Sequence, residues 1–362
     1  MIYIVIFLVA VALFIKAFTL KHVLDNVTYS IKSEKSVVEP GESFSVTTTL
    51  KNGKRMPVMF IRLEELIPTK MQVEGASQQF YAMNDKSRLV SSTYLMPYQK
   101  FTRVFNASIP DRGRYFLHGA TLKGGDIFGI GETVEYVTLL EEIVVLPKAV
   151  SCGKLETVLG GFLGDFSVNR FIMEDPILTI GFRDYTGREP MKHINWAQSL
   201  KANKLMVKNF DHTTDLSATV ILNIECGEDG REINSALMEN AFSVARFVCE
   251  HLEQKNVKYS FFTNATAAGA VGHWKSVGEG LGHRHLYTIL EGLGRATYDS
   301  TAPFTSILEK AAHVAERGRA HIVITPQIES YWQSAFKRLS VAADGKCLLI
   351  SADKYMEEKE EN

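Results

Sequence analysis

The sequence predicts a multidomain protein with an N-terminal transmembrane helix, an antiparallel β-sandwich of immunoglobulin-like type, and an α/β domain with a mostly parallel sheet. Residues 2–20 form an unbroken apolar run apart from one lysine near its end. Residues 26–148 contain short alternating runs separated by turn residues, a pattern typical of a sandwich. From residue 218 onward, apolar strand-like runs alternate with amphipathic helical runs, which indicates a parallel sheet covered on both faces.

The pattern divides the chain into five segments. They are an anchor (1–24), a β-sandwich domain (25–148), a linker region (149–217), an α/β domain (218–352) and an acidic tail (353–362). Within the linker region, glycines predict that 151–175 is an irregular connection. The tail is short and strongly charged, so we expect it to be disordered.

Composition excludes several classes of protein. The 362 residues are 46% hydrophobic and 22% charged, which suffices for two or three domains with buried cores. The formal net charge of −1 gives no overall field that would attract nucleic acid. The four cysteines stand far apart and form no Cys-x-x-Cys pair, so neither a zinc site nor a disulfide framework is predicted. They are Cys152, Cys226, Cys249 and Cys347.

The apolar run 2–20 is long enough to be a membrane anchor. As a helix it would measure about 29 Å, close to the hydrocarbon thickness of a bilayer. No basic residue precedes it and no Ala-x-Ala-like site follows it, which disfavours a cleaved signal peptide. Basic residues fall on the C-terminal side, in the last part of the run and after it, namely Lys16, Lys21, His22, Lys32 and Lys35. The positive-inside rule therefore predicts a single-pass protein whose bulk lies in the cytoplasm.

The end of the first α/β strand is where an open sheet would bind a ligand. An Asp-x-Ser-x-Ser sequence at this place would hold magnesium through oxygen ligands. The chain has Asn223, Glu225 and Gly227 at these positions. We therefore predict that no metal binds there, and no cofactor-binding motif is recognised elsewhere.

No complete catalytic set is recognisable. The chain lacks the G-x-S-x-G and H-E-x-x-H motifs. His273, His283 and His285 fall in a glycine-rich stretch without a nearby carboxylate or thiol, so we interpret them as loop residues. The prediction is a protein without catalytic residues, and the alternative is a hydrolase that uses Asp184, His193 or Glu225.

The stretch 183–210 is dense in basic, aromatic and amide side chains. Within it, 195–202 is predicted as a short helix and 204–210 as a strand, and Arg183 and Asp184 as a local ion pair. Two interpretations remain open: a structural network that buries Trp196, or a recognition surface, because Arg, Tyr and Trp dominate binding hot spots. The candidate binding residues are Arg183, Asp184, Tyr185, Lys192, Asn195, Trp196 and Lys208. Nearby acidic residues disfavour nucleic acid as the partner.

Two motifs resemble those of the family called domain of unknown function 58 (DUF58). The first motif consists of Arg183, Tyr185, Lys192, Ile194-Asn195-Trp196, Ser199, Leu205 and Val207-Lys208. The second consists of Arg112-Gly113-x-Tyr115, Gly119 and Asp126-x-Phe128-Gly129. The order of membrane helix, β-domain, signature and α/β domain is also similar. The chain departs from the family in having one membrane helix instead of two, and Gly187-Arg188-Glu189 where Gly-Asp is usual.

The resemblance implies a C-terminal domain similar to a von Willebrand factor type A domain, here with a degraded metal motif. It also implies partnership with MoxR-type AAA+ ATPases and with other proteins of the same complex, in assembly or maturation of protein complexes. We therefore expect a membrane-anchored, non-enzymatic adaptor. An envelope-facing adhesion or sensor module is the other alternative beside the hydrolase.

Overall fold

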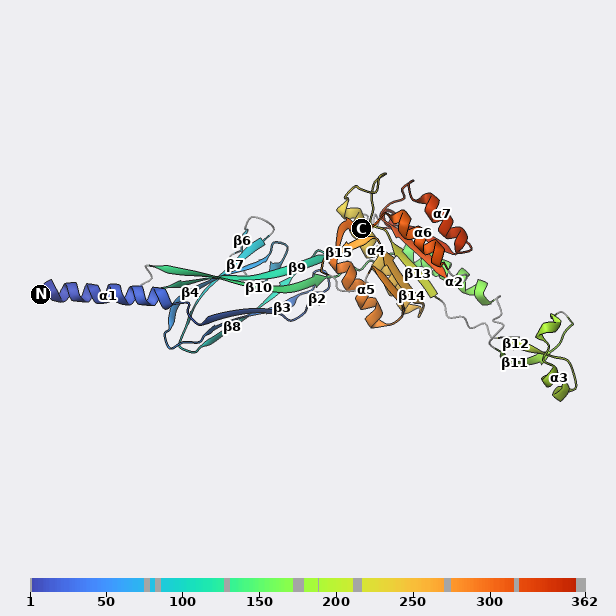
Figure 1. The fold of residues 1–362 in the computed structure, drawn as a ribbon, viewed down its shortest axis with the longest axis horizontal. Coiled ribbons are helices and arrows are strands. Elements are labelled where there is room, and N and C mark those ends of the chain that lie inside the picture. Colours follow the sequence, from blue (N-terminus) through green and yellow to red (C-terminus); the bar gives the residue numbers. More distant parts are fainter. Residues whose placement is uncertain are drawn as a thin grey trace. The chain divides into compact units, whose positions relative to one another are not determined.

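The computed structural model describes residues 2–74, 79–81, 86–126, 131–171, 179–187, 189–210, 217–269, 275–315 and 319–355. The chain divides into two compact units (Figure 1). The first unit comprises Met1–Lys148 together with Leu290–Ala296, and the second comprises Ala149–Ile289 and Thr297–Asn362. The predicted acidic tail lies outside the described residues from position 356 onward.

Helix α1 (Ile2–His22) is the predicted apolar helix, and none of its residues is buried. Among the described helices, it is the one that is long and apolar enough to cross a membrane. The two residues after it, Val23 and Leu24, are buried in the core of the first unit. The helix therefore enters the folded unit without an intervening linker.

The first unit contains the two predicted antiparallel sheets. The four-stranded sheet has the order β1-β3-β8-β5, with strands β1 (Val27–Ser33), β3 (Phe44–Asn52), β5 (Gln72–Val73) and β8 (Lys100–Ser108). The six-stranded sheet has the order β2-β10-β9-β4-β7-β6, with strands β2 (Val37–Val38), β4 (Val58–Pro68), β6 (Gln79–Tyr81), β7 (Lys86–Leu95), β9 (Gly113–Gly125) and β10 (Glu132–Val145). All neighbouring strands run antiparallel except β2 and β10.

One hydrophobic core joins the two sheets. Burial alternates along β1 and β3, because successive side chains of a strand point to opposite faces. Val46 and Leu50 of the smaller sheet share a cluster with Ile61, Leu117 and Ile143 of the larger sheet. This arrangement confirms the antiparallel sandwich predicted from the spacing of the turn residues.

The second unit is built on a five-stranded sheet of order β16-β14-β13-β18-β19. Strands β13 (Ser217–Leu222), β14 (Lys258–Thr263), β18 (Ala320–Thr325) and β19 (Cys347–Ser351) are parallel, and β16 (Ser276–Gly280) joins the edge antiparallel. Every residue of β18 is buried. A mostly parallel sheet was predicted from such apolar runs, and the structure confirms it.

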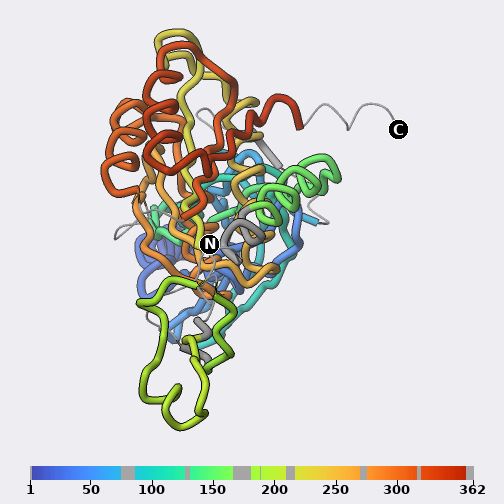
Figure 2. Tube along the Cα trace, turned by 90° about the vertical axis from the view of Figure 1, so that its right-hand side faces the viewer, coloured from blue at the N-terminus to red at the C-terminus, as the bar shows by residue number. Residues whose placement is uncertain are grey.

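Helices cover this sheet. Helix α4 (Ser235–Gln254) packs on β13, β14 and β18 and begins where the Asn234 side chain accepts a hydrogen bond from Leu237 N. Helices α6 (Phe304–Val314) and α7 (Gln333–Ala342) pack side by side in Figures 1 and 2. Their core is centred on the buried side chains of Phe304, Leu308 and Trp332. The remaining elements are α5 (His283–Arg295), β15 (Ala265–Ala267), β17 (Ala296–Ser300) and η2 (Ala352–Tyr355).

Helix α2 (Gly153–Phe171) contradicts the prediction that 151–175 is an irregular connection. Leu155, Leu159 and Leu163 recur at a spacing of four residues and are buried. Burial of one helix face stabilises a helix more than propensity does, so three glycines at about 1 kcal/mol each do not prevent it.

Candidate functional site

The DUF58-like signature forms a small module that we call the signature module (residues 179–210). Strands β11 (Thr179–Asp184) and β12 (Met206–Phe210) pair antiparallel, and η1 (Met191–His193) and α3 (Trp196–Ala202) connect them. Figure 2 shows this segment in lime green as a hairpin. The helix and the second strand confirm the elements predicted for 195–202 and 204–210.

Two signature residues hold α3 against β12. Asn195 caps the helix by accepting a hydrogen bond from Gln198 N at 3.1 Å, and its own N–H donates to Met206 O at 2.8 Å. Ser199 is buried, and its hydroxyl donates to Asn195 O at 2.7 Å and accepts from Met206 N at 2.8 Å. Asn195 and Ser199 are therefore structural residues of the module.

The ion pairs differ from the predicted one. Arg183 pairs with Glu189 at 2.5 Å, and Asp184 pairs with Lys204 at 2.7 Å. Arg183 and Asp184 do not pair with each other because adjacent residues of a strand point to opposite faces. Desolvation raises the pKa of Glu189, but hydrogen bonds from its own backbone, Thr186 and Arg183 outweigh it and lower the pKa to about 2.

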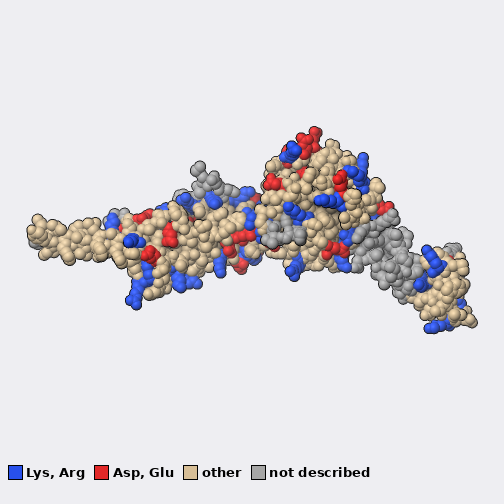
Figure 3. Space-filling view, in the orientation of Figure 1, with Lys and Arg blue, Asp and Glu red and all other residues tan. Residues whose placement is uncertain are grey.

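Trp196 is exposed, which contradicts the interpretation that buries it in a core. Its exposed fraction is 59%, and that of Leu200 is 82%. The two residues are four positions apart on α3, so they lie on the same face of the helix. Sequence reasoning missed Leu200, although its spacing from Trp196 could have identified it. Lys192 and Lys201 are also exposed, and Figure 3 shows basic residues in this module.

A shallow cavity of about 450 Å³ lies beside β12. It brings together two candidate binding residues, Arg183 and Lys208, with His193. Tyr185 contributes a backbone hydrogen bond from its N–H to Leu205 O at 2.9 Å. Some residues of the signature therefore stabilise the fold of the module, and others lie at its surface, where they could bind a partner.

The β-domain signature is structural where it is described. Arg112 is buried and donates from Nη1 to Leu293 O and Ala296 O, both at 2.7 Å, within the first unit. Gly113 begins β9, and the Tyr115 hydroxyl donates to Asp111 O at 3.1 Å. Asp126 is also buried. Phe128 and Gly129 lie outside the described residues.

The two charged residues that precede Gly113 have different surroundings. Asp111 is partly exposed and pairs with Lys70 at 3.1 Å. The guanidinium of Arg112 instead donates to backbone carbonyls that come from a distant part of the sequence.

A closed polar network lies at the carboxyl end of β13, where the metal motif would stand. The Asn223 side chain accepts hydrogen bonds from Glu225 N and Asn264 Nδ2, both at 2.9 Å. Asn223 Nδ2 donates to Thr325 Oγ1 at 3.1 Å. Gly227 adopts φ of 80°. The position that a metal-binding aspartate would take is thus held by a neutral amide with partners on neighbouring strands.

The Glu225 carboxylate is buried and accepts hydrogen bonds from Phe304 N at 3.1 Å and from the Tyr331 hydroxyl at 2.6 Å. Within the described residues, no group of three His, Cys, Asp or Glu side chains is placed to hold a metal ion. The prediction that the three histidines are loop residues is wrong for His283 and His285, which begin helix α5. The His285 ring forms a hydrogen bond with Tyr259 O at 2.9 Å, and His273 lies outside the described residues.

Comparisons with known proteins add little to this geometry. No family model matches the chain. An uncharacterised protein, YeaD of Bacillus subtilis (strain 168), is 21% identical over 320 residues, which cover 83% of this chain and 70% of that protein.

Solved structures with some likeness include two small domains. The CARDB domain of the PF1109 protein from Pyrococcus furiosus is 15% identical, with a TM-score of 0.22, over 33% of this chain and 87% of that chain. A cohesin module of a family 33 glycoside hydrolase from Clostridium perfringens is 13% identical, with a TM-score of 0.24, over 33% of this chain and 96% of that chain. Such TM-scores carry no argument about fold or function, so the DUF58 resemblance stays a prediction.

Proposed function

We propose that this protein is a membrane-anchored, non-enzymatic adaptor of the DUF58 type, whose signature module binds a MoxR-type AAA+ ATPase. The observation that carries the proposal is the exposure of Trp196 and Leu200 on one face of α3. Asn195 and Ser199 of the same helix are used by the fold itself. Some residues of the signature thus stabilise the module, whereas Trp196 and Lys192 are exposed to solvent, and this arrangement fits a recognition role.

The chemistry of this face indicates the kind of partner surface. Tryptophan is enriched at binding hot spots, and burying Trp196 and Leu200 in a partner groove would supply several kcal/mol before ordering costs. Exposed Lys192 and Lys201 favour a partner whose rim is acidic, and such charges mainly speed association. The proposed partner therefore has an apolar groove with carboxylates around it.

The anchor is supported by the way α1 joins the first unit. Leu20 O accepts a hydrogen bond from the Thr133 hydroxyl at 2.7 Å. Lys54 Nζ donates to Val23 O at 2.5 Å and to Asp25 O at 2.6 Å. These bonds hold the end of the helix against the sandwich, so a membrane that contains α1 would lie close to this end of the unit.

Side chains at this end suit the membrane interface. The Tyr98 N–H donates to Lys54 O at 3.3 Å, which places the β7–β8 turn beside the end of α1. Met96 and Tyr98 in that turn are exposed, and so is Arg55 in the neighbouring turn. Aromatic and basic side chains are enriched at the headgroup level, which supports a membrane location for the protein. The proposed orientation, with the bulk in the cytoplasm, rests on the basic residues that follow α1.

For the α/β domain we propose a von Willebrand factor type A-like fold that has lost its metal. The mostly parallel sheet and the network of Asn223, Glu225 and Tyr331 at the carboxyl end of β13 support this assignment. In this proposal the protein does not bind partners through a metal in the α/β domain. It binds them through the signature module.

The test is crosslinking of the full-length protein in its native membrane, followed by quantitative identification of the captured proteins. Wild-type protein is expected to capture a MoxR-type ATPase. The Trp196→Ala, Leu200→Ala double variant is expected to capture at least about thirtyfold less, because truncation of a hot-spot residue costs about 2 kcal/mol or more. Val341→Ala is the matched control, since Val341 is 82% exposed on helix α7.

Three outcomes are informative. Loss in the double variant with retention in the control supports the signature module as the docking face. Equal capture of the ATPase by the double variant and the control would reject the signature module as the docking face. It would leave the proposed adaptor function in place. Failure of wild-type protein to capture any AAA+ ATPase rejects the proposed partner.

A further inference from the structure

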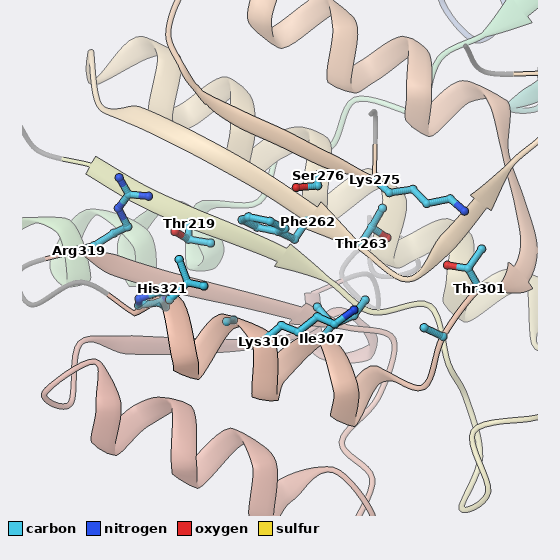
Figure 4. Close-up of a pocket in the computed structure, with 13 residues that line it drawn as sticks. Thr219, Phe262, Thr263, Lys275, Ser276, Thr301, Ile307, Lys310, Arg319 and His321 are labelled. Atoms are coloured by element: carbon cyan, nitrogen blue, oxygen red, sulfur yellow. The ribbon is translucent and has the colours of Figure 1, made fainter. Parts of the chain in front are cut away.

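A second cavity, of about 470 Å³, lies between the sheet of the second unit and helix α6. Its floor includes Thr219, Phe262 and His321 from strands β13, β14 and β18, and its roof includes Ile307 and Ala311 from α6. Figure 4 shows the strand residues on one side and Ile307 on the helix opposite. Val314 lines the cavity and is exposed, so the cavity is open to solvent at the end of α6.

His321 is the unusual residue of the floor. It is 2% exposed, and neither ring nitrogen has a hydrogen-bond partner among the described residues. Buried polar atoms without a partner are rare in proteins, because each costs about 1–3 kcal/mol. A polar group of a bound ligand would remove that cost.

The charged residues that line this cavity are all basic. They are Lys275, Lys310 and Arg319. Arg319 also pairs with Glu279, whereas Lys275 and Lys310 form no ion pair with any residue that the structure describes. Figure 4 shows Lys275 and Thr301 toward one end of the cavity and Arg319 and His321 toward the other. An anionic group is therefore favoured, and apolar side chains fill the region between the two ends.

We propose that this cavity binds an organic carboxylate with an apolar body of about ten carbon atoms, a size that a cavity of this volume accommodates. The carboxylate lies between Lys275 and Lys310, and the apolar body packs on Phe262 and Ile307. A polar atom on the body or a retained water bonds to the His321 ring. Neutral apolar molecules lack the carboxylate that would bind to the lysines. Small inorganic anions lack the apolar body that would pack in the cavity.

This site is separate from the Glu225 network and from the signature module, because none of the residues named in those sites lines the cavity. The inference therefore does not depend on the proposed adaptor function. The α/β domain would then have a small-molecule site, and this site would lie apart from the position of the degraded metal motif.

The test uses 4-phenylbutyrate as the probe and the full-length protein in lipid nanodiscs, with binding measured by titration calorimetry against protein-free nanodiscs. We expect saturable binding by 4-phenylbutyrate. 4-Phenylbutanol, which lacks the charge, and acetate, which lacks the apolar body, are expected to bind at least about tenfold more weakly, since one charge-assisted hydrogen bond contributes roughly a factor of ten.

Variants then locate the site. Lys275→Met with Lys310→Met is expected to weaken 4-phenylbutyrate about tenfold or more and to leave 4-phenylbutanol unchanged. Ala311→Phe is expected to abolish binding of both by filling the cavity. Lys337→Met, at an exposed position on α7 outside the cavity, is the control and should bind as wild type does.

The proposal is overturned if 4-phenylbutyrate and 4-phenylbutanol bind equally, or if wild-type protein binds neither above the nanodisc background. It is also overturned if the lysine double variant binds 4-phenylbutyrate as tightly as the Lys337→Met control. The lysines are surface residues, so this variant remains decisive even if Ala311→Phe fails to fold.

Discussion

The Tyr331 hydroxyl donates a 2.6 Å hydrogen bond to the Glu225 carboxylate at the carboxyl end of the central strand β13. The same carboxylate accepts from Phe304 N at the start of α6, where the helix dipole favours a negative charge. Burial, and then the hydrogen bond to Glu225, raise the pKa of Tyr331 well above its usual range, so the hydroxyl remains a donor. This pair ties the helix and the loop before α7 to the sheet.

Tyr331→Phe is expected to destabilise the second unit by about 1–2 kcal/mol, because a buried carboxylate loses one of its donors. Glu225→Gln, which keeps the shape but loses the charge, is expected to have a similar effect. Hydrogen exchange of peptides from β13 and α6 measures the change in local stability. Exchange at wild-type rates in both variants would contradict a structural role for this pair.

The partly exposed side chain of Arg103 forms an ion pair with a buried carboxylate, that of Glu65, in the sandwich. Glu65 is fully buried and also accepts a hydrogen bond from the Tyr29 hydroxyl at 3.0 Å. Arg103→Met would leave this carboxylate without its counter-charge, so we expect a loss of about 3–5 kcal/mol in the first unit. Hydrogen exchange of peptides from β1 and β8 measures it.

Arg88→Met is the matched control for Arg103→Met. Arg88 pairs at 3.3 Å with Glu64, the neighbour of Glu65, but its side chain is half exposed. Glu64 keeps its ion pairs with Lys123 and Arg62 in this variant, so we expect a loss of less than about 1 kcal/mol. Equal losses of stability in the two variants would contradict the larger contribution that we expect from the pair between Arg103 and Glu65.

Gly119, a residue of the second family-like motif, is predicted to tolerate no side chain. Its φ is +88°, and an added Cβ would lie 2.1 Å from Val137 O. Gly119 pairs with Thr138 at the edge of an irregularity in the β9–β10 register, so the backbone there is held on both strands. We expect Gly119→Ala to lower the thermal midpoint of the first unit by well over 5 °C, since left-handed strain alone costs about 1 kcal/mol or more and a backbone clash adds to it.

Gly41→Ala separates the two contributions. Gly41 also has positive φ, +76°, but nothing lies within 4 Å of an added Cβ. Gly41→Ala should therefore lose only the stability that backbone strain costs, because no clash is added. A Gly119→Ala protein no less stable than Gly41→Ala would contradict the close approach to Val137.

Local patterns predicted much of this fold. Periodicity predicted the antiparallel sheets and the alternation of parallel strands with amphipathic helices such as α4, and the Asn195 cap marks the start of α3. The glycines of α2 misled the prediction, because burial of Leu155 and Leu159 depends on tertiary packing that no local rule contains. The partners of Arg112 and Glu225 are distant in sequence, as are the strands that place His321 beside α6. A single sequence does not reveal such long-range pairings.

Membrane orientation can be tested with one introduced cysteine. Three native cysteines are buried and the fourth is partly buried. Burial raises the pKa of Cys226 to about 11 and that of Cys347 to about 12, so these thiols stay protonated and unreactive near neutral pH. We expect Val341→Cys to react with a membrane-impermeant maleimide only after cells are permeabilised. Labelling in intact cells would place the α/β domain outside the cytoplasm and favour the adhesion or sensor alternative.

His321 makes the stability of the second unit depend on pH. Burial, and then the charge of Arg319, lower its pKa from 6.5 to about 4. The unfolded chain binds a proton at His321 near pH 6.5, and the folded chain does not. The contribution of His321 to the free energy of unfolding is therefore fully present above pH 6.5. This contribution is lost as the pH falls from 6.5 toward 4, by at most about 3 kcal/mol.

Replacing the imidazole removes this dependence. His321→Leu is expected to flatten the stability profile between pH 7 and pH 4.5, and to raise stability at pH 7 by about 1–3 kcal/mol because no buried nitrogen is left unpaired. His313→Leu, at an exposed position on α6, is the control and should keep the wild-type slope. Chemical denaturation at a series of pH values, followed by hydrogen exchange of β18 peptides, measures both. If His321→Leu retains the slope of the control, other groups carry the acid sensitivity and His321 is not the buried base that its surroundings indicate.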